Sequence, residues 1–333
     1  MRKPLIVLLI IVLTIPMLFA QAQAEQKKAE VVQLILALSN PESDPWAQGT
    51  KKFAEELERI SGGTMKVEYF FGGQLYNASN ILAAVTAGKI DFTGFGMTSL
   101  PEAPYLGMFQ AAYMFRDAQH AQDFYAGEIG QKIFDDIEKK AGMRLLDTAY
   151  VGTRQISLAK KIGDVKVPAD LKGITLRMPP GASWAALAEA IGTNPVPIAL
   201  NEVYMAMKTG AVDGQDNALP TTKANSFDEV TDQLVLTDHV VWNLHLACNA
   251  ARWNSFTDQQ KAWVLEAAAI GCDYTTESFK ATEESLKKEF AAKGVRIVTP
   301  DKQAFMAYAE NYYRTNTKVT ETWNWEYFDA LKK

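Results

Sequence analysis

The stretch Ile174–Pro220 decides the fold and reads ITLRMPPGASWAALAEAIGTNPVPIALNEVYMAMKTGAVDGQDNALP. Its first segment is β-rich, carries Arg177 and stops at two consecutive prolines. Two helical runs follow, the second closed by Gly210, and a short segment then leads to Asn217. An arginine and an asparagine therefore each follow a strand-to-loop junction, where open α/β sheets bind their ligands. We expect this stretch to hold an anion.

Strands and helices alternate in the chain before this stretch. Residues 31–39, 67–71 and 90–93 have the aliphatic or alternating pattern of strands. Between the first two, Ser43 or Asp44 caps a predicted helix that has a proline in its first turn. Such an alternation predicts an α/β protein with a mostly parallel sheet that helices cover on both faces.

An internal similarity links this first part of the chain to the deciding stretch. Ala84–Asp91 matches Ala206–Asp213, because both read Ala, apolar, two variable residues, Gly, variable, apolar, Asp. A match over eight residues is either a coincidence or the mark of two lobes with related architecture. In the second case Phe95 and Asn217, each four residues after the Asp, project from equivalent loops across a shared cleft.

The longest predicted helix begins at Thr257, where Thr257 and Gln260 fit a capping box, and continues to Gly294. It is far longer than an average helix, and Gly271 is the position where it could bend. We expect it to lie across both lobes as a spine. Further predicted elements are a helix over 119–140, a strand over 144–150, a strand over 239–247 and a last helix from 303.

The first 24 residues have the pattern of a cleaved secretory signal peptide: basic residues, an apolar run and a small-x-small site before Glu25. A retained membrane anchor is the alternative, but the run is short and broken by Thr14 and Pro16. Cleavage leaves a net charge of 32 − 39 = −7, from 34 basic residues less Arg2 and Lys3 and from 39 acidic ones. An exported, mildly acidic chain without a basic cluster is not expected to bind nucleic acid.

No pattern typical of a catalytic or metal site is found, so we expect neither an enzyme nor a cofactor or metal. None of the three His lies in a ligand-like arrangement. Cys248 and Cys272 either form a disulfide or are two separate buried thiols. The rival hypothesis is a periplasmic enzyme that uses Asp213 or Glu202 as acid–base group. The missing nucleophile favours binding over turnover.

Arg177 is the most informative candidate. In an alternating strand, Arg177 and Thr175 share the face opposite Ile174 and Leu176. A buried guanidinium needs a partner, which is either a ligand carboxylate or an internal carboxylate. Asn217 can complete carboxylate recognition or act as a turn former in Asp-Gly-Gln-Asp-Asn.

Several motifs resemble one family, the extracytoplasmic solute receptors of tripartite ATP-independent periplasmic (TRAP) transporters. They are Leu-Arg-x-Pro at 176–179, Gly-Thr-Asn-Pro-Val-Pro at 192–197, Glu-Val-Tyr at 202–204 and Val-Asp-Gly-Gln-Asp-Asn at 212–217. Gly-Thr-Arg at 152–154, Thr-Asp-His at 237–239 and the long helix also match, so the resemblance covers nearly the whole mature chain.

The resemblance implies a two-lobed periplasmic binding protein of type II-like fold, with a β hinge, that closes over an organic acid and delivers it to membrane permease subunits. Residues 25–151 and 243–282 would form lobe I, and residues 152–242 and 283–333 lobe II. We expect a monomer in the periplasm. A sensor that feeds a signalling partner is the alternative binding role.

The resemblance also implies the site residues. Arg177 matches the carboxylate-clamping arginine, Asn217 its partner and Arg154 a second ligand-facing arginine. The chain departs from the sialic acid-binding branch at Leu200, where that branch has Phe, and at Gly96, where it has an acidic residue. We add Phe95, Trp184, Trp242 and Asn243 as ligand-facing candidates. The aromatic ones suggest a monocarboxylate that is aromatic, with a hydroxy or keto acid as the other class.

Overall fold

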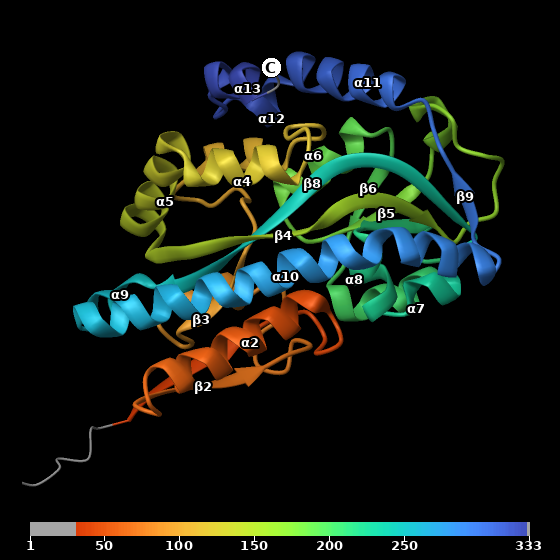
Figure 1. Ribbon diagram of the computed structural model, residues 1–333. Coiled ribbons are helices and arrows are strands. Elements are labelled where there is room, and N and C mark those ends of the chain that lie inside the picture. Colours follow the sequence, from red (N-terminus) through yellow and green to blue (C-terminus); the bar gives the residue numbers. More distant parts are fainter. Residues whose placement is uncertain (1–30, 332–333) are drawn as a thin grey trace, which may run out of the picture.

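The predicted α/β class is confirmed by a computed structural model, which describes residues 31–331; the expected signal peptide lies outside this part. One nine-stranded sheet forms the centre of the described chain, with helices on both faces (Figure 1). The strands are β1 (Val32–Ala37), β2 (Met65–Phe70), β3 (Phe92–Phe95), β4 (Met143–Leu158), β5 (Thr175–Met178), β6 (Asn194–Pro197), β7 (Gly214–Asn217), β8 (Gln233–Asn249) and β9 (Arg296–Val298).

The order of the strands has an internal symmetry. It is β2-β1-β3-β8-β4-β7-β5-β6, with β9 added to β8. On each side the outer strands are parallel, as β1 is with β2 and β3, and as β5 is with β6 and β7. On each side the inner neighbour is a long antiparallel strand, β8 for β3 and β4 for β7. The sheet thus consists of two half-sheets of the same topology.

The sequence similarity between residues 84–91 and 206–213 lies at equivalent places in these half-sheets. Gly88 and Gly210 follow their helices with positive φ, at 67° and 75°. Asp91 accepts a hydrogen bond from Ile35 N at 2.7 Å, and Asp213 accepts one from Thr175 N at 2.8 Å. Each carboxylate therefore ties a loop to the neighbouring strand, β1 or β5, and the similarity marks a repeated structural unit.

The strands β4 and β8 belong to both half-sheets. Residues 245–248 of β8 pair with β3, whereas residues 233–235 pair with β9. The two strands pair with each other from Met143 opposite Asn249 to Leu158 opposite Gln233. The register shifts between Tyr150 and Thr153, around Gly152, whose φ is 91°. The structure joins the halves through these two continuous strands, which are longer than the sequence predicted.

The helices differ from the prediction in two places. The run over 119–140 is interrupted at Gly127, and the last helix, expected from 303, is divided into three. The α-helices are α2 (Pro45–Ile60), α3 (Ile81–Thr86), α4 (Ala118–Ala126), α5 (Glu128–Ala141), α6 (Ala182–Ala190), α7 (Val203–Thr209), α8 (Leu219–Ala224), α9 (Ala250–Ser255), α10 (Asp258–Ala292), α11 (Lys302–Thr315), α12 (Thr317–Thr320) and α13 (Trp325–Leu331). The 3-10 helices are η1 (Pro104–Gln110), η2 (Pro168–Leu171), η3 (Leu200–Glu202) and η4 (Phe227–Val230).

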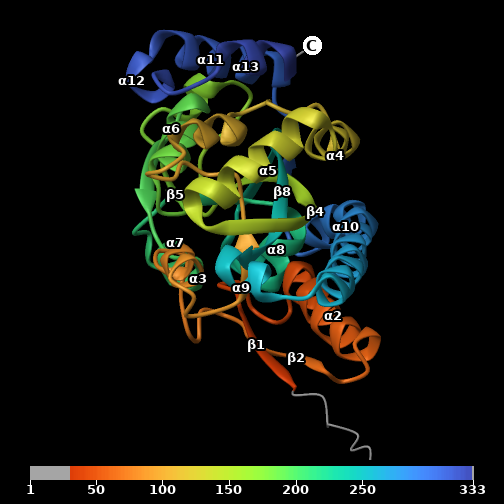
Figure 2. The same cartoon turned by 90° about the vertical axis from the view of Figure 1, so that its left-hand side faces the viewer.

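The long helix α10 is the expected spine. It has 35 residues, begins with the predicted capping box of Thr257 and Gln260, and packs against α2 and β4 and, further along, α8 (Figure 1). Helices α11–α13 lie at the opposite end of the molecule from α2, beyond α6 (Figure 2). None of the helices within residues 31–331 is long and apolar enough to cross a membrane.

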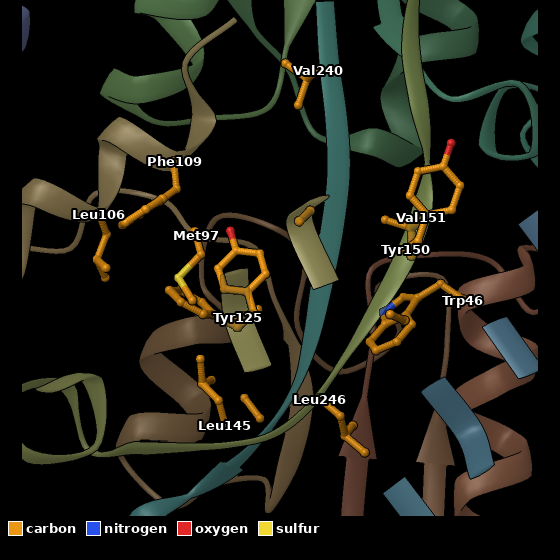
Figure 3. Close-up of a cluster of buried hydrophobic side chains, with 14 of the residues drawn as sticks. Trp46, Met97, Leu106, Phe109, Tyr125, Leu145, Tyr150, Val151, Val240 and Leu246 are labelled. Carbon is orange, nitrogen blue, oxygen red and sulfur yellow. The ribbon is translucent and has the colours of Figure 1, made fainter. Parts of the chain in front are cut away.

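A large apolar core surrounds the central strands. In Figure 3, Met97, Phe109 and Tyr125 lie on one side of β8 and Trp46 and Val151 on the other. Cys248 and Cys272 are buried and form no disulfide, so their thiols belong to this core.

Gly271 has a packing role. At the crossing of α10 and α2, a Cβ on Gly271 would lie 2.6 Å from Gly49 O and 2.9 Å from Phe53 Cβ. Helix α10 continues through this position, so the close approach of the two helices requires a residue without a side chain.

We expect Gly271→Ala to lower the free energy of unfolding by up to about 2 kcal/mol, because overpacking costs about 1–3 kcal/mol and the helix-propensity gain offsets only about 1 kcal/mol of this. Gly163→Ala is the control, since a Cβ there has nothing within 4 Å. Urea unfolding of both variants measures the difference. Equal or higher stability of Gly271→Ala would contradict this packing.

Candidate functional site

A cavity of about 210 Å³ lies between the two half-sheets. Its wall includes residues at or just after the carboxyl ends of parallel strands from both halves, namely Ser39 after β1, Gly96 after β3, Pro179 after β5 and Asn217 at the end of β7. Ligand sites of open α/β sheets lie at this edge. The volume is below the roughly 300–1,000 Å³ of pockets for drug-sized ligands, so the cavity suits a small molecule.

Five of the seven candidate residues line this cavity: Arg154, Arg177, Trp184, Asn217 and Trp242. Phe95 and Asn243 are not among its lining residues, and both side chains are buried. Side chains alternate between the faces of a strand, so Gly94 and Gly96 face the cavity on either side of Phe95. Trp242 and Leu244 flank Asn243 in the same way. Phe95 and Asn217 thus end equivalent strands of the two half-sheets, as predicted, but only Asn217 lines the cavity.

Arg177 is buried without a carboxylate partner. Its side chain is 1% exposed, and its only hydrogen bond within the described chain runs from Nε to Ile198 O at 2.8 Å. Burial lowers the pKa of Arg177 to about 9, while the charge of Asp216 opposes this shift. The guanidinium therefore stays cationic at neutral pH. Its two terminal nitrogens remain free to bind an anion.

An internal carboxylate was one of the two partners that the sequence allowed for Arg177. In the structure such an ion pair is formed by Arg154 instead. Arg154 Nε donates to Asp216 Oδ2 at 2.6 Å and Nη2 donates to Asp216 Oδ1 at 2.9 Å. His239 Nε2 lies 3.2 Å from the same carboxylate. Burial opposes ionisation of Asp216, but Arg154 and His239 hold the pKa of this carboxyl well below its usual range. Arg154 is thus fixed and electrically compensated at the cavity wall.

Two tryptophans cover Arg154. Its guanidinium carbon lies 4.7 Å from the ring centre of Trp184 and 5.7 Å from that of Trp242. The ring centres of the two tryptophans are 5.0 Å apart. A Cβ on Gly96 would lie 2.3 Å from Trp242 Cζ2, so the Trp242 ring occupies the space of a side chain at that position. An acidic residue at position 96 is incompatible with this arrangement.

Asn217 is the last residue of β7, a strand in which all four residues are buried. It is therefore not the turn former that its sequence context also allowed. Its Nδ2 donates to Gln215 Oε1 at 2.6 Å, and Gln215 Nε2 in turn donates to Thr222 Oγ1 at 3.3 Å. These bonds orient the Asn217 amide and leave Nδ2 with a second hydrogen. That hydrogen is available to an oxygen in the cavity.

The sequence did not single out three buried residues at or behind the cavity wall. Asp216 belongs to Asp-Gly-Gln-Asp-Asn, a composition typical of a turn, but it lies in the buried strand β7. Asp44 is confirmed as the cap of α2, but it also lines the cavity. Burial raises the pKa of Asp44, and hydrogen bonds from Asn40, Trp46 and Thr221 oppose this shift. Gln110 ends η1 in a segment without periodicity, so no sequence signal could have found it. Its side chain is buried at the cavity wall.

The charges at the wall favour one anionic group. The charged lining residues are Asp44, Arg154 and Arg177, and Asp216 already compensates Arg154. Only Arg177 offers an unpaired positive charge there. The acid–base candidates Asp213 and Glu202 do not line the cavity, and Asp213 is bound to Thr175 and Lys160.

Comparisons with known proteins agree with this geometry. The family described as bacterial extracellular solute-binding protein, family 7, matches residues 36–318. The sialic acid-binding periplasmic protein SiaP of Vibrio cholerae is 30% identical over 266 residues, which are 79% of this chain and 82% of that protein. A TRAP periplasmic solute-binding protein of Roseobacter denitrificans with bound 3-deoxy-D-manno-oct-2-ulosonic acid has a TM-score of 0.85 and 27% identity, over 91% of this chain and 99% of that one.

A second receptor from Roseobacter denitrificans, with bound L-galactonate, has a TM-score of 0.83 and 25% identity, and again covers 91% of this chain and 99% of its own. These similarities confirm the predicted fold class and family.

We expect Asp216→Asn to lower the free energy of unfolding by about 3–5 kcal/mol, because it leaves Arg154 buried without its counter-charge. The matched control is Asp164→Asn, which removes an exposed ion pair with Arg296 and should cost no more than about 1 kcal/mol. Chemical unfolding of both variants gives the comparison. A similar small effect of both changes would show that the buried pair is not required.

Proposed function

The chain belongs to the bacterial extracellular solute-binding proteins of family 7, the receptors of TRAP transporters, and we propose that its own solute is a small organic monocarboxylate bound in the cavity between the half-sheets. Receptors of this family bind solutes, work with TRAP permeases and are periplasmic. For this chain we propose the same membrane partner, export by cleavage after residue 24, and a monomeric receptor.

The observation that carries the proposal is the buried, unpaired guanidinium of Arg177. Burying a charge without a partner costs several kcal/mol in order of magnitude, and a bound carboxylate would offset this cost. A ligand carboxylate fits the planar fork of Arg177 with two parallel hydrogen bonds. Water is excluded when the cavity closes, which strengthens this ion pair.

We assign three roles around the carboxylate. Arg177 supplies the charge, Asn217 donates its second Nδ2 hydrogen, and Arg154 offers the Nη1 that Asp216 does not use. A second carboxylate on the ligand would meet Asp44 and no further unpaired cation on the wall, which supports a monoanionic acid. The relatives with bound 3-deoxy-D-manno-oct-2-ulosonic acid and L-galactonate also hold monocarboxylates.

We propose that the protein closes about a hinge where three chain segments meet. Tyr150 on β4 pairs with Asn243 on β8, and the hydroxyl of Tyr150 donates to Glu283 of α10 at 3.0 Å. The expected lobe boundaries, at 151/152, 242/243 and 282/283, all fall at this point. The lobes of the proposal are therefore residues 31–151 with 243–282, and residues 152–242 with 283–331.

Of the hydrogen bonds that cross between these lobes, two are made by the serine hydroxyls of Ser183 and Ser43. Ser183 Oγ on α6 lies 2.9 Å from Ser99 Oγ, and Ser43 Oγ donates to Ala224 O at 3.1 Å. Both involve small polar side chains that water can satisfy equally well when the lobes part. These two can open at little energetic cost. The buried bonds of Ala112 N to the hydroxyl of Tyr313, at 3.0 Å, and of Tyr113 N to His239 O, at 2.8 Å, instead hold the segment after Gln110 to lobe II.

We expect Arg177→Met to abolish binding of the acid while leaving the free energy of unfolding within about 1 kcal/mol of the parent or above it. The variant loses the clamp and one hydrogen bond, but it also removes a desolvated charge. Arg177→Lys should bind more weakly than the parent, because a point charge cannot replace the fork.

Mass spectrometry of acids that copurify with the parent, and thermal shifts with a carboxylate panel, give the ligand for this comparison. Arg59→Met is the control, since Arg59 is exposed on α2. Undiminished affinity of Arg177→Met would exclude the clamp. A large loss of stability would instead indicate a structural role for Arg177.

We expect the radius of gyration of the parent, measured by small-angle X-ray scattering, to fall when the copurifying acid is added back to the stripped protein. Arg177→Met should show no such decrease at the same acid concentration. An unchanged radius in the parent, despite saturation with the acid, would rule out hinge closure.

A further inference from the structure

We propose that Gln110 is a specificity residue that hydrogen-bonds a hydroxyl group of the bound acid, so that this receptor takes a hydroxylated monocarboxylate. The inference rests on the proposed capture of a carboxylate and adds the chemistry of the rest of the molecule. Gln110 is the last residue of η1 and lies on the wall of the cavity.

The Gln110 amide is buried and unsatisfied. Its side chain is 1% exposed, and neither Oε1 nor Nε2 has a hydrogen-bond partner among the residues that the structure describes. Because both atoms lack a partner, the conclusion does not depend on which is oxygen and which is nitrogen. Buried side-chain amides are nearly always hydrogen-bonded, and a buried amide without hydrogen bonds costs free energy.

Buried neighbours hold Gln110 in this position. Met108 and Phe109 precede it in the apolar core, and the ring centre of Phe109 lies 5.5 Å from that of Phe124. On the other side, Ala112 N donates to the hydroxyl of Tyr313 at 3.0 Å. The segment is anchored at both ends, so its amide cannot turn out to solvent without disturbing the core.

Gln110 and the carboxylate clamp come from different parts of the molecule. Arg177 and Asn217 belong to β5 and β7 of one half-sheet, whereas Gln110 precedes β4 and belongs to the proposed lobe I. The amide is therefore presented by a chain segment other than the strands of the clamp, and the residues after it, Ala112 and Tyr113, are hydrogen-bonded to Tyr313 and His239. It contacts the part of the acid that distinguishes one carboxylate from another.

The two free groups of the amide select a hydroxyl. A hydroxyl can donate to Oε1 and accept from Nε2, because it has one hydrogen and two lone pairs. A keto oxygen satisfies only Nε2, and an alkyl chain or aromatic ring satisfies neither. The tryptophans offer little to an aromatic acid, because Trp184 is 7% exposed and both rings cover Arg154. The hydroxy acid is thus favoured over the aromatic acid.

The test measures calorimetric affinities for three pairs of acids with equal chain length. The pairs are D-erythronate with butanoate, L-galactonate with hexanoate, and 3-deoxy-D-manno-oct-2-ulosonate with octanoate. The parent should bind at least one hydroxylated acid roughly 100-fold or more tightly than its partner, since a site built for a hydroxyl rejects an analogue without it. Gln110→Leu should reduce that ratio by about tenfold or more, through weaker binding of the hydroxylated acid.

Gln259→Leu is the matched control, because Gln259 is exposed on α10, and it should leave all affinities unchanged. Gln110→Leu should melt at or above the temperature of the parent, since it replaces an unsatisfied amide by an apolar side chain of similar volume. A lower melting temperature would indicate a structural role and overturn the assignment.

Three further results separate this inference from the proposed function. If carboxylates bind and Arg177→Met abolishes their binding, but Gln110→Leu keeps the selectivity of the parent, only the role of Gln110 is wrong. If the parent binds none of the three hydroxylated acids, the hydroxy-acid class is overturned. Failure to bind any carboxylate at all would overturn the proposed function as well.

Discussion

The antiparallel pairing of β4 with β8 is the constraint on which the rest of the structure depends. It continues from Met143 opposite Asn249 to Leu158 opposite Gln233, and each half-sheet adds its parallel strands to one of these two. Because the halves have the same topology and meet on antiparallel strands, the carboxyl ends of their parallel strands border one cavity. The fold thus creates a site between two bodies before any side chain is considered.

The two arginines of that site differ in their partners. Arg154 has a buried carboxylate partner in Asp216, and two tryptophan rings cover its guanidinium. Arg177, equally buried, has only a backbone carbonyl. The wall therefore holds one compensated and one uncompensated positive charge, and the second is what an organic anion can neutralise. The opposing wall, with Asp44 and the unsatisfied amide of Gln110, is neutral or negative and polar, which suits hydroxyl groups better than a second carboxylate.

Much of the fold could be predicted from local patterns. The cap at Asp44, the capping box at Thr257 and the strand carrying Arg177 depend on neighbouring residues, and all three are present. The match between residues 84–91 and 206–213 correctly indicated two related halves, since both aspartates tie a loop to an adjacent strand. The extent of β4 and β8 was underestimated, because a strand that serves two half-sheets has no periodic signal at its middle. The break at Gly127 was missed for the opposite reason: the apolar spacing continues across it.

The sequence by itself determined the α/β class, the family and the identity of Arg177, Asn217 and Arg154 as candidates, because motifs and periodicity are properties of contiguous residues. Only the tertiary structure decided which arginine is compensated, that Phe95 and Asn243 face away from the cavity, and that Gln110 has no partner. These depend on contacts between segments distant in the chain, such as Arg154 with Asp216 and Gly96 with Trp242. Burial and hydrogen-bond satisfaction are set by such contacts, and no local pattern encodes them.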